Sequence, residues 1–130
     1  MNFYRIEHIN KVCQNLETTL QFYQTLFPDW FIRARGDSDD LSWIHFGDRQ
    51  FYISLYERRD ASQSIPLNTG NIDHVGLVVE DGKKMMAVLK KKGIEYFVED
   101  SSETKYRIYV QDPDHTLLEL VEYNADYELR

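Results

Sequence analysis

Apolar and β-branched residues in the first half of the chain follow two different periods, and each period predicts an element. A short run from about Ile6 to Val12 has the composition of a strand. Apolar side chains then recur at helical spacing over about residues 16–27, with Asn15 as the predicted N-cap. Pro28 ends that helix, because proline disfavours a helical residue before it. Three strands are predicted next, at about residues 30–35, 41–46 and 50–57.

The second half of the chain repeats this order of elements. A strand is expected at about residues 72–79 and a helix at about residues 82–92. Asp81 can cap the start of this helix, and Gly93 can cap its end. Three further strands are predicted at about residues 95–99, 105–111 and 116–123.

The two halves also match residue by residue at their first and last strands. Each first strand has an isoleucine, an acidic residue, a histidine and a β-branched residue in that order, and its histidines, His8 and His74, are 66 residues apart. The last strands match at an offset of 65, so that Ser54 corresponds to Glu119. The sequence therefore predicts an α+β fold of two βαβββ modules. The modules are expected at about residues 4–57 and 71–123, joined by a polar linker at 58–70.

Composition and charge limit the classes of partner. The chain has 130 residues, of which 42% are apolar, enough for a packed core. Its net charge of −7 argues against sequence-independent nucleic-acid binding, which needs a surplus of Lys and Arg. We see no secretory signal and no run near the ~20 apolar residues that span a bilayer, so we expect no membrane partner. The single cysteine, Cys13, cannot form an internal disulfide and fits a cytoplasmic protein.

The repeat, its paired histidines and a glutamate on the last strand after an Asp-Pro-Asp turn together point to a family. This arrangement resembles the vicinal oxygen chelate superfamily, which includes glyoxalase I, bleomycin-resistance proteins and extradiol dioxygenases. The resemblance extends from about Tyr4 to Tyr123. It implies a single glyoxalase-like domain over residues 1–130, with both modules in a cupped mixed sheet. It further implies a small-molecule ligand and a homodimer.

The superfamily's metal positions match three residues of this chain, His8, His74 and Glu119. The resemblance implies that they bind a divalent ion such as Mn, Fe, Ni or Zn. Two histidines and one carboxylate are a recognised set that leaves positions open for substrate. Glyoxalase I has a fourth ligand on the last strand of its first module, where this chain has Ser54, expected to be a spectator to the metal. Glu57 cannot replace it, because a residue three positions along a strand faces the opposite side.

The residues themselves support this site and also allow a second interpretation. Glu119 lies between two leucines on an apolar strand, where a carboxylate is costly unless it is paired or bound to metal. A single strand histidine, by contrast, is usually structural. In a metal-free relative, His8, His74 and Glu119 could instead hydrogen-bond one another or a ligand.

Four further residues are candidates for contact with a substrate. Tyr52, Ser54 and Tyr56 share one face of their strand, because side chains alternate. Tyr109 lies ten residues before Glu119, in a segment similar to extradiol dioxygenases and fosfomycin-resistance transferases, where this tyrosine faces the substrate. The resemblance therefore implies a catalytic role for Tyr109, although aromatic residues also favour strands for packing alone.

Three features depart from these patterns or stay open. The extradiol pattern has a histidine where this chain has residues 100–102, and the transferases have cationic and serine residues where it has Glu99 and Glu103. His115 occupies a turn position that is commonly glycine, and we interpret it as a tolerated turn residue. His45 could face either side of its strand.

The function expected from this sequence is that of a metal-dependent enzyme of the lyase, isomerase or dioxygenase type. The ion would act as a Lewis acid on two oxygens of a small substrate. The alternative is a metal-free protein that sequesters an aromatic or cationic small molecule, as bleomycin-resistance proteins do, which the acidic composition would suit.

Overall fold

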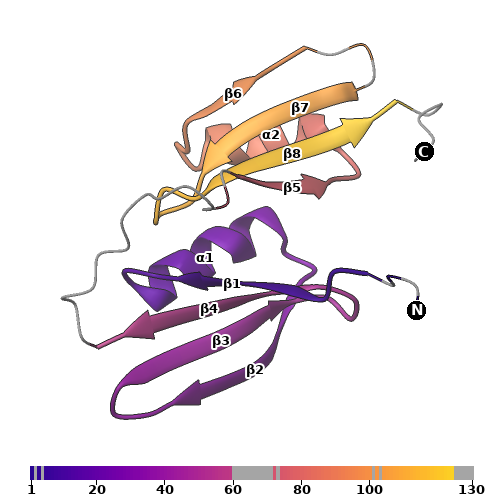
Figure 1. The fold of residues 1–130 in the computed structure, drawn as a ribbon. Helices are drawn as coiled ribbons and strands as arrows, with labels where there is room; N and C mark the ends of the chain where they lie inside the picture. Colours follow the sequence, from indigo (N-terminus) through magenta and orange to yellow (C-terminus); the bar gives the residue numbers. More distant parts are fainter. Residues whose placement is uncertain are drawn as a thin grey trace. The chain divides into compact units, whose positions relative to one another are not determined.

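The computed structural model describes residues 1, 3, 5–59, 72, 74–100, 102 and 104–124. The chain divides into two compact units, Met1–Pro66 and Leu67–Arg130, drawn in indigo to magenta and in salmon to yellow (Figure 1). Most of the predicted linker, residues 60–70, lies outside the described residues, as do Tyr4, Asp73, Ser101 and Glu103. Within the described part of the chain, neither helix is long and apolar enough to cross a membrane.

The first unit is a four-stranded mixed sheet with one helix on one face (Figure 1). Its elements in chain order are β1 (His8–Val12), α1 (Leu16–Leu26), β2 (Phe31–Asp37), β3 (Leu41–Gly47) and β4 (Tyr52–Arg58). The strand order is β1-β4-β3-β2, with β1 parallel to β4 and the other pairs antiparallel.

The helix of the first unit forms where the sequence predicts it. The Asn15 side chain accepts a hydrogen bond from the Thr18 backbone N–H at 3.0 Å, which caps the first turn. Phe27 before Pro28 has non-helical dihedral angles, so the helix ends at Leu26. The core lies between α1 and the helix-facing side of β3 and β4; its fully buried residues are Tyr23, Ile44, Ile53 and Leu55.

The second unit repeats this architecture. Its elements are β5 (His74–Val78), α2 (Gly82–Lys91), β6 (Tyr96–Val98), β7 (Thr104–Gln111) and β8 (Leu117–Tyr123). The strand order is β5-β8-β7-β6, again with only the first pair parallel. The core lies between α2 and the helix-facing side of β7 and β8; its fully buried residues are Leu89, Ile108, Leu118 and Leu120.

The start of α2 is tied to the last strand. Asp81 caps the helix by accepting from the Lys84 backbone N–H at 2.9 Å. The Glu122 carboxylate accepts from the Gly82 backbone N–H at 2.7 Å, where the helix dipole favours negative charge. A side chain at residue 82 would collide with Tyr106, because a Cβ there would lie 2.6 Å from the tyrosine. These contacts place the alternate residues of β8 on the other face of the sheet.

The structure confirms the predicted fold of two βαβββ modules with mixed sheets. Several boundaries differ from the prediction by one or two residues. The first strand of each module begins at its histidine, and β6 is shorter than the predicted strand at 95–99. Residue 58, assigned to the linker, belongs to β4. Such differences are expected at element ends, where side-chain pattern constrains the backbone least.

Candidate functional site

We call the side of each sheet that faces away from its helix the open face. On the open face of the second unit, the Nε2 atom of His74 lies 3.2 Å from one oxygen of Glu119, Oε2. The Nε atom of Arg107 lies 3.1 Å from the other oxygen, Oε1, without hydrogen-bond geometry. The side chain of Glu119 is 14% exposed and that of His74 is 40% exposed. A mostly buried carboxylate is thus placed between two nitrogen groups from two neighbouring strands.

Strand pairing explains how these three side chains meet. Gly76 of β5 is the partner of Glu119 in the parallel pair, and His74 stands two residues before it on the same face. The pairing of β7 with β8 shifts by one residue between Thr104 and Tyr106. Beyond this bulge Arg107 faces the same side as Glu119, one cross-strand pair along.

The paired groups fit a divalent ion. Two adjacent ligand atoms, each about 2.1 Å from one ion, are about 3 Å apart, which is close to the observed separation of His74 Nε2 and Glu119 Oε2. There is room beside them, because a Cβ at Gly76 would meet nothing within 4 Å. Within the described part of either unit, no set of three His, Cys, Asp or Glu side chains is placed to hold a metal.

Tyr109 lies directly across from Glu119 in the register, on the open face. Its ring stacks on that of Phe97 with centroids 4.8 Å apart. Burial, followed by a hydrogen bond with Glu99, raises the pKa of the Tyr109 hydroxyl above its ordinary value. The hydroxyl therefore stays protonated at neutral pH and can donate a hydrogen bond, but it is a poor base.

His8 lies on the open face of the first unit, held by a carboxylate. Its Nδ1 atom is 2.8 Å from Glu7 Oε1, and the Tyr52 hydroxyl donates to the same oxygen at 3.3 Å. The hydrogen bond with His8 is the largest cause that lowers the pKa of the exposed Glu7 carboxyl. The ring of His8 also stacks on that of Tyr52, with centroids 4.8 Å apart. Glu7 thus orients the imidazole through one nitrogen and leaves Nε2 turned from this contact.

Ser54 lies on the same face, between Tyr52 and Tyr56 along β4, and is 8% exposed. Its partner on β3 is His45, which settles the direction of that histidine. The ring of His45 lies 4.6 Å from those of both Trp43 and Tyr52. Burial first, and then the charges of His8 and Arg33, lower the pKa of His45. Where the second unit has the carboxylate of Glu119, the first unit therefore has the hydroxyl of Ser54 beside the neutral imidazole of His45.

The structure thus brings together His74 with Glu119 in one unit, and Tyr52 with His8 in the other. Two side chains that contact these residues were not predicted from the sequence: Arg107, which lies beside Glu119, and Glu7, which contacts His8. Arg107 had a signal, because it is two residues from Tyr109 on one strand and so shares its face, but alternation did not show that it approaches Glu119. Glu7 had a signal, an acidic residue before the histidine in both repeats, but the pattern did not show that it contacts the ring.

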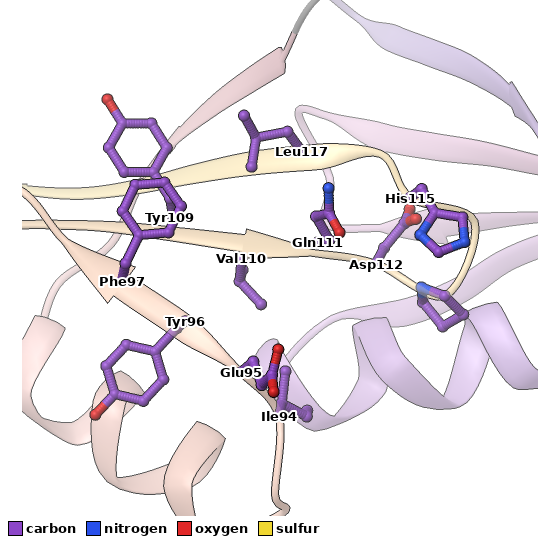
Figure 2. Close-up of a pocket in the computed structure, with 11 residues that line it drawn as sticks. Ile94, Glu95, Tyr96, Phe97, Tyr109, Val110, Gln111, Asp112, His115 and Leu117 are labelled. Carbon is purple, nitrogen blue, oxygen red and sulfur yellow. The ribbon is translucent and has the colours of Figure 1, made fainter.

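A cavity of about 610 Å³ opens beside the candidate site in the second unit (Figure 2). Its walls include Tyr109 and Leu117, the register partners of Glu119 and His74 respectively. Phe97, Gln111 and Glu95 continue the wall away from that pair. The cavity therefore starts in the next row of side chains beyond the candidate metal ligands.

His115 lines the other end of this cavity with a positive φ of 65°. This confirms the left-handed turn that the sequence suggested, in which a residue with a Cβ costs on the order of 1 kcal/mol. The turn is closed by the buried Asp112 carboxylate, which accepts from the backbone N–H groups of Asp114 and Thr116 at 2.9 and 3.0 Å.

Comparison with protein families agrees with this architecture. Residues 5–120 match the model of the Glyoxalase/Bleomycin resistance protein/Dioxygenase superfamily. The chain belongs to this superfamily. The match includes the three proposed ligand positions and all the residues that line the cavity. No curated protein sequence matches the chain significantly.

Solved structures of this superfamily share the fold at low sequence identity. A glyoxylase/bleomycin resistance protein/dioxygenase domain from Frankia sp. EAN1pec is 19% identical, with a TM-score of 0.79 over 95% of this chain and 100% of the other. The fosfomycin resistance protein FosX from Listeria monocytogenes is 19% identical, with a TM-score of 0.73 over 96% and 95%. The trypanothione-dependent glyoxalase I of Leishmania major is 20% identical, with a TM-score of 0.73 over 92% and 87%.

One of these neighbours has been solved with a metal. A point mutant of FosX, 19% identical to this chain, was crystallised with Mn(II) and 1S,2S-dihydroxypropylphosphonic acid. At such identity the likeness establishes the fold, and the chemistry must be argued from the residues of this chain.

Proposed function

We propose that this protein is a divalent-metal-dependent enzyme of the glyoxalase superfamily that acts on a small substrate with two chelating oxygens. His74 and Glu119 would bind the ion, with His8 of the first unit as the third ligand. The proposal includes one domain formed by both modules and a homodimer, as the resemblance implies. Cytoplasmic location stays a prediction from the sequence.

The observation that supports this proposal best is the pair of His74 and Glu119. Their facing atoms are 3.2 Å apart on neighbouring strands, and the two carboxylate oxygens have different partners. Arg107 holds the oxygen that faces away from the histidine, so the carboxylate is oriented before an ion arrives. Glu7 does the same for His8. Such supporting groups are typical of metal sites whose ligands are preorganised.

When bound, an Mn, Fe, Ni or Zn ion would supply Lewis-acid stabilisation of negative charge on substrate oxygen. The chain's own groups would position the substrate. Tyr109 is a protonated donor across from Glu119, so it can hydrogen-bond a substrate oxygen. Tyr52, Ser54 and Tyr56 present hydroxyl groups on the open face of the first unit, where they can contact the substrate. The proposal covers reactions of the lyase, isomerase and dioxygenase types, and the identity of the substrate would decide among them.

Metal titration of the full chain tests the proposal. Protein stripped with chelator is titrated with Mn(II), and free Mn(II) is followed by electron paramagnetic resonance. We expect about one ion per chain. His74→Ala and Glu119→Gln should weaken binding by more than about 100-fold, because a lost ligand costs more than the 10- to 100-fold that supporting residues contribute.

Glu122→Gln is the matched control, since it removes the same charge from the same strand on the helix side. A glutamine there can still accept from the Gly82 backbone N–H, so binding should stay within about twofold of wild type. Wild-type protein that takes up none of Mn, Fe, Ni or Zn would refute the proposal. So would equal affinity in the wild type and both ligand variants.

One observation favours a second candidate, a metal-free protein that binds a small molecule. Arg107 already supplies a positive charge beside Glu119, and His74 faces its other oxygen, so the carboxylate does not need an ion to be tolerated in the fold. The same titration separates the candidates, because only the metal-dependent enzyme shows uptake that His74→Ala removes.

A further inference from the structure

The cavity of the second unit lies next to the proposed metal ligands His74 and Glu119. Leu117 and Tyr109 line it, and they are the register partners of His74 and Glu119. Tyr109 is directly opposite Glu119, about 5 Å away across the strands, and Leu117 is two residues from Glu119 along β8, about 7 Å away, so the cavity begins about 5–7 Å from the ligands. A substrate held by two oxygens would extend its remaining part into this space.

The charge of the cavity wall selects what can enter. Among the described residues that line it, Glu95 and Asp112 are the charged side chains, and no lysine or arginine takes part. The Asp112 carboxylate is occupied by turn amides, whereas Glu95 is exposed at the wall (Figure 2). The rings of Phe97 and Tyr109 stack on each other and line the same cavity as Glu95. A carboxylate and aromatic rings that line one cavity favour an ammonium group and disfavour an anion.

His115 adds an independent observation. It takes a left-handed conformation at the cavity wall, where glycine would be free of strain. A residue other than glycine held at a positive φ can mark a position that serves a site. The imidazole gives this end of the cavity a hydrogen-bonding group that glycine would lack.

We propose that this cavity binds the amine-bearing end of the substrate, with Glu95 facing the ammonium group and Phe97, Tyr109 and Leu117 around an apolar or aromatic body. The inference rests on the proposed function, since it places the chelating oxygens at His74 and Glu119. It names the substrate class: small molecules with two chelating oxygens at one end and a cationic amine about 7 Å or more away.

Three catechols that differ only in their tail test this inference. Dopamine carries an ammonium, 4-ethylcatechol is neutral, and 3-(3,4-dihydroxyphenyl)propanoate carries a carboxylate. Their affinities for the full chain loaded with Mn(II) are measured anaerobically by isothermal titration calorimetry. We expect dopamine to bind about five- to tenfold more tightly than 4-ethylcatechol, as for a partly exposed ammonium contact, and the carboxylate to bind most weakly.

Two variants test the residues. Glu95→Gln should reduce the preference for dopamine over 4-ethylcatechol to less than about twofold, while Glu80→Gln, an equal charge change outside the cavity wall, should leave it unchanged. His115→Gly should raise the melting temperature and weaken the binding of all three catechols. A merely tolerated turn residue would change the melting temperature alone.

The outcomes separate this inference from the metal proposal. If the catechols bind equally with and without Mn(II), and dopamine is still preferred, the metal proposal fails and the cavity assignment stands. If Mn(II) strengthens all three equally, with no preference for the amine, the cavity assignment is wrong. Failure of dopamine to bind at millimolar concentration, or an unchanged preference in Glu95→Gln, would overturn it as well.

Discussion

The two units share one architecture, yet their open faces have become chemically different. On the helix side the equivalent positions match: Ile53 and Leu118 are both fully buried between a sheet and its helix. On the open side Ser54 corresponds to Glu119, a hydroxyl beside His45 in one unit and a carboxylate between His74 and Arg107 in the other. The comparison teaches that packing preserves the repeat, whereas the face without a helix is free to diverge in its chemistry.

The largest effect should come from the positions at which the units agree. Ile53→Ala and Leu118→Ala each remove a fully buried side chain from the helix side, and each should lower the free energy of unfolding by about 3 kcal/mol. Urea unfolding followed by circular dichroism measures both. Val78→Ala, a change at an exposed open-face position, should stay within about 0.5 kcal/mol. A cost below about 1 kcal/mol at either buried position would contradict equivalent cores.

A smaller effect should follow from giving the first unit the carboxylate that the second unit has at the equivalent position. Ser54→Glu places a carboxylate at a position that is 8% exposed, beside an imidazole whose pKa is lowered. Without a cationic partner it should cost about 2 kcal/mol of folding stability at pH 8. Ser54→Gln has nearly the same volume without the charge, and comparing the two by urea unfolding isolates the charge. Equal stability of both variants would show that the first unit accepts a carboxylate as readily as the second.

The histidines of the two units differ in their support, and Glu7→Gln tests that difference. Loss of the Glu7 carboxylate should weaken Mn(II) binding about tenfold, since the hydrogen bond to His8 Nδ1 orients the ring. Glu17→Gln is the control, because it removes an exposed carboxylate that pairs with Arg35 away from the open face. Paramagnetic resonance of free Mn(II) measures both. An unchanged affinity in Glu7→Gln would mean that His8 does not depend on this contact.

The smallest expected effect concerns His45, at a position where the second unit has Tyr109. Its pKa is lowered in the folded state, chiefly by burial, so the unfolded chain binds more protons as pH falls below about 6.5. Wild-type stability should therefore decrease on acidification through this range. His45→Asn should lose part of that dependence, measured as unfolding free energy at pH 7.5 and 5.5. If the unfolding free energy of His45→Asn changed between pH 7.5 and 5.5 as much as that of wild type, His45 would not be the group responsible.

The fold was largely predictable because the two modules repeat the same order of elements. Asn15 and Asp81 cap the helices as their sequence positions predicted, and the repeat located both sheets. The open-face contacts were less accessible. The face of His45 follows from its pairing with Ser54, and the approach of Arg107 to Glu119 follows from the pairing of β7 with β8, and neither pairing is given by local periodicity. The roles of His8, His74, Glu119 and Tyr109 stay predictions supported by this geometry.

The ion pair of Arg107 with Glu119 affects whether the chain must bind a metal before it can fold. A carboxylate that waits for a metal as its only partner would hinder folding, as in small zinc domains that are unfolded without their ion. Here the carboxylate already has a cationic partner, Arg107, on its own sheet. On the proposed function, the newly synthesised chain can therefore fold first and acquire the proposed ion afterwards. Metal supply would then limit how much of the protein is active, and not how much survives synthesis.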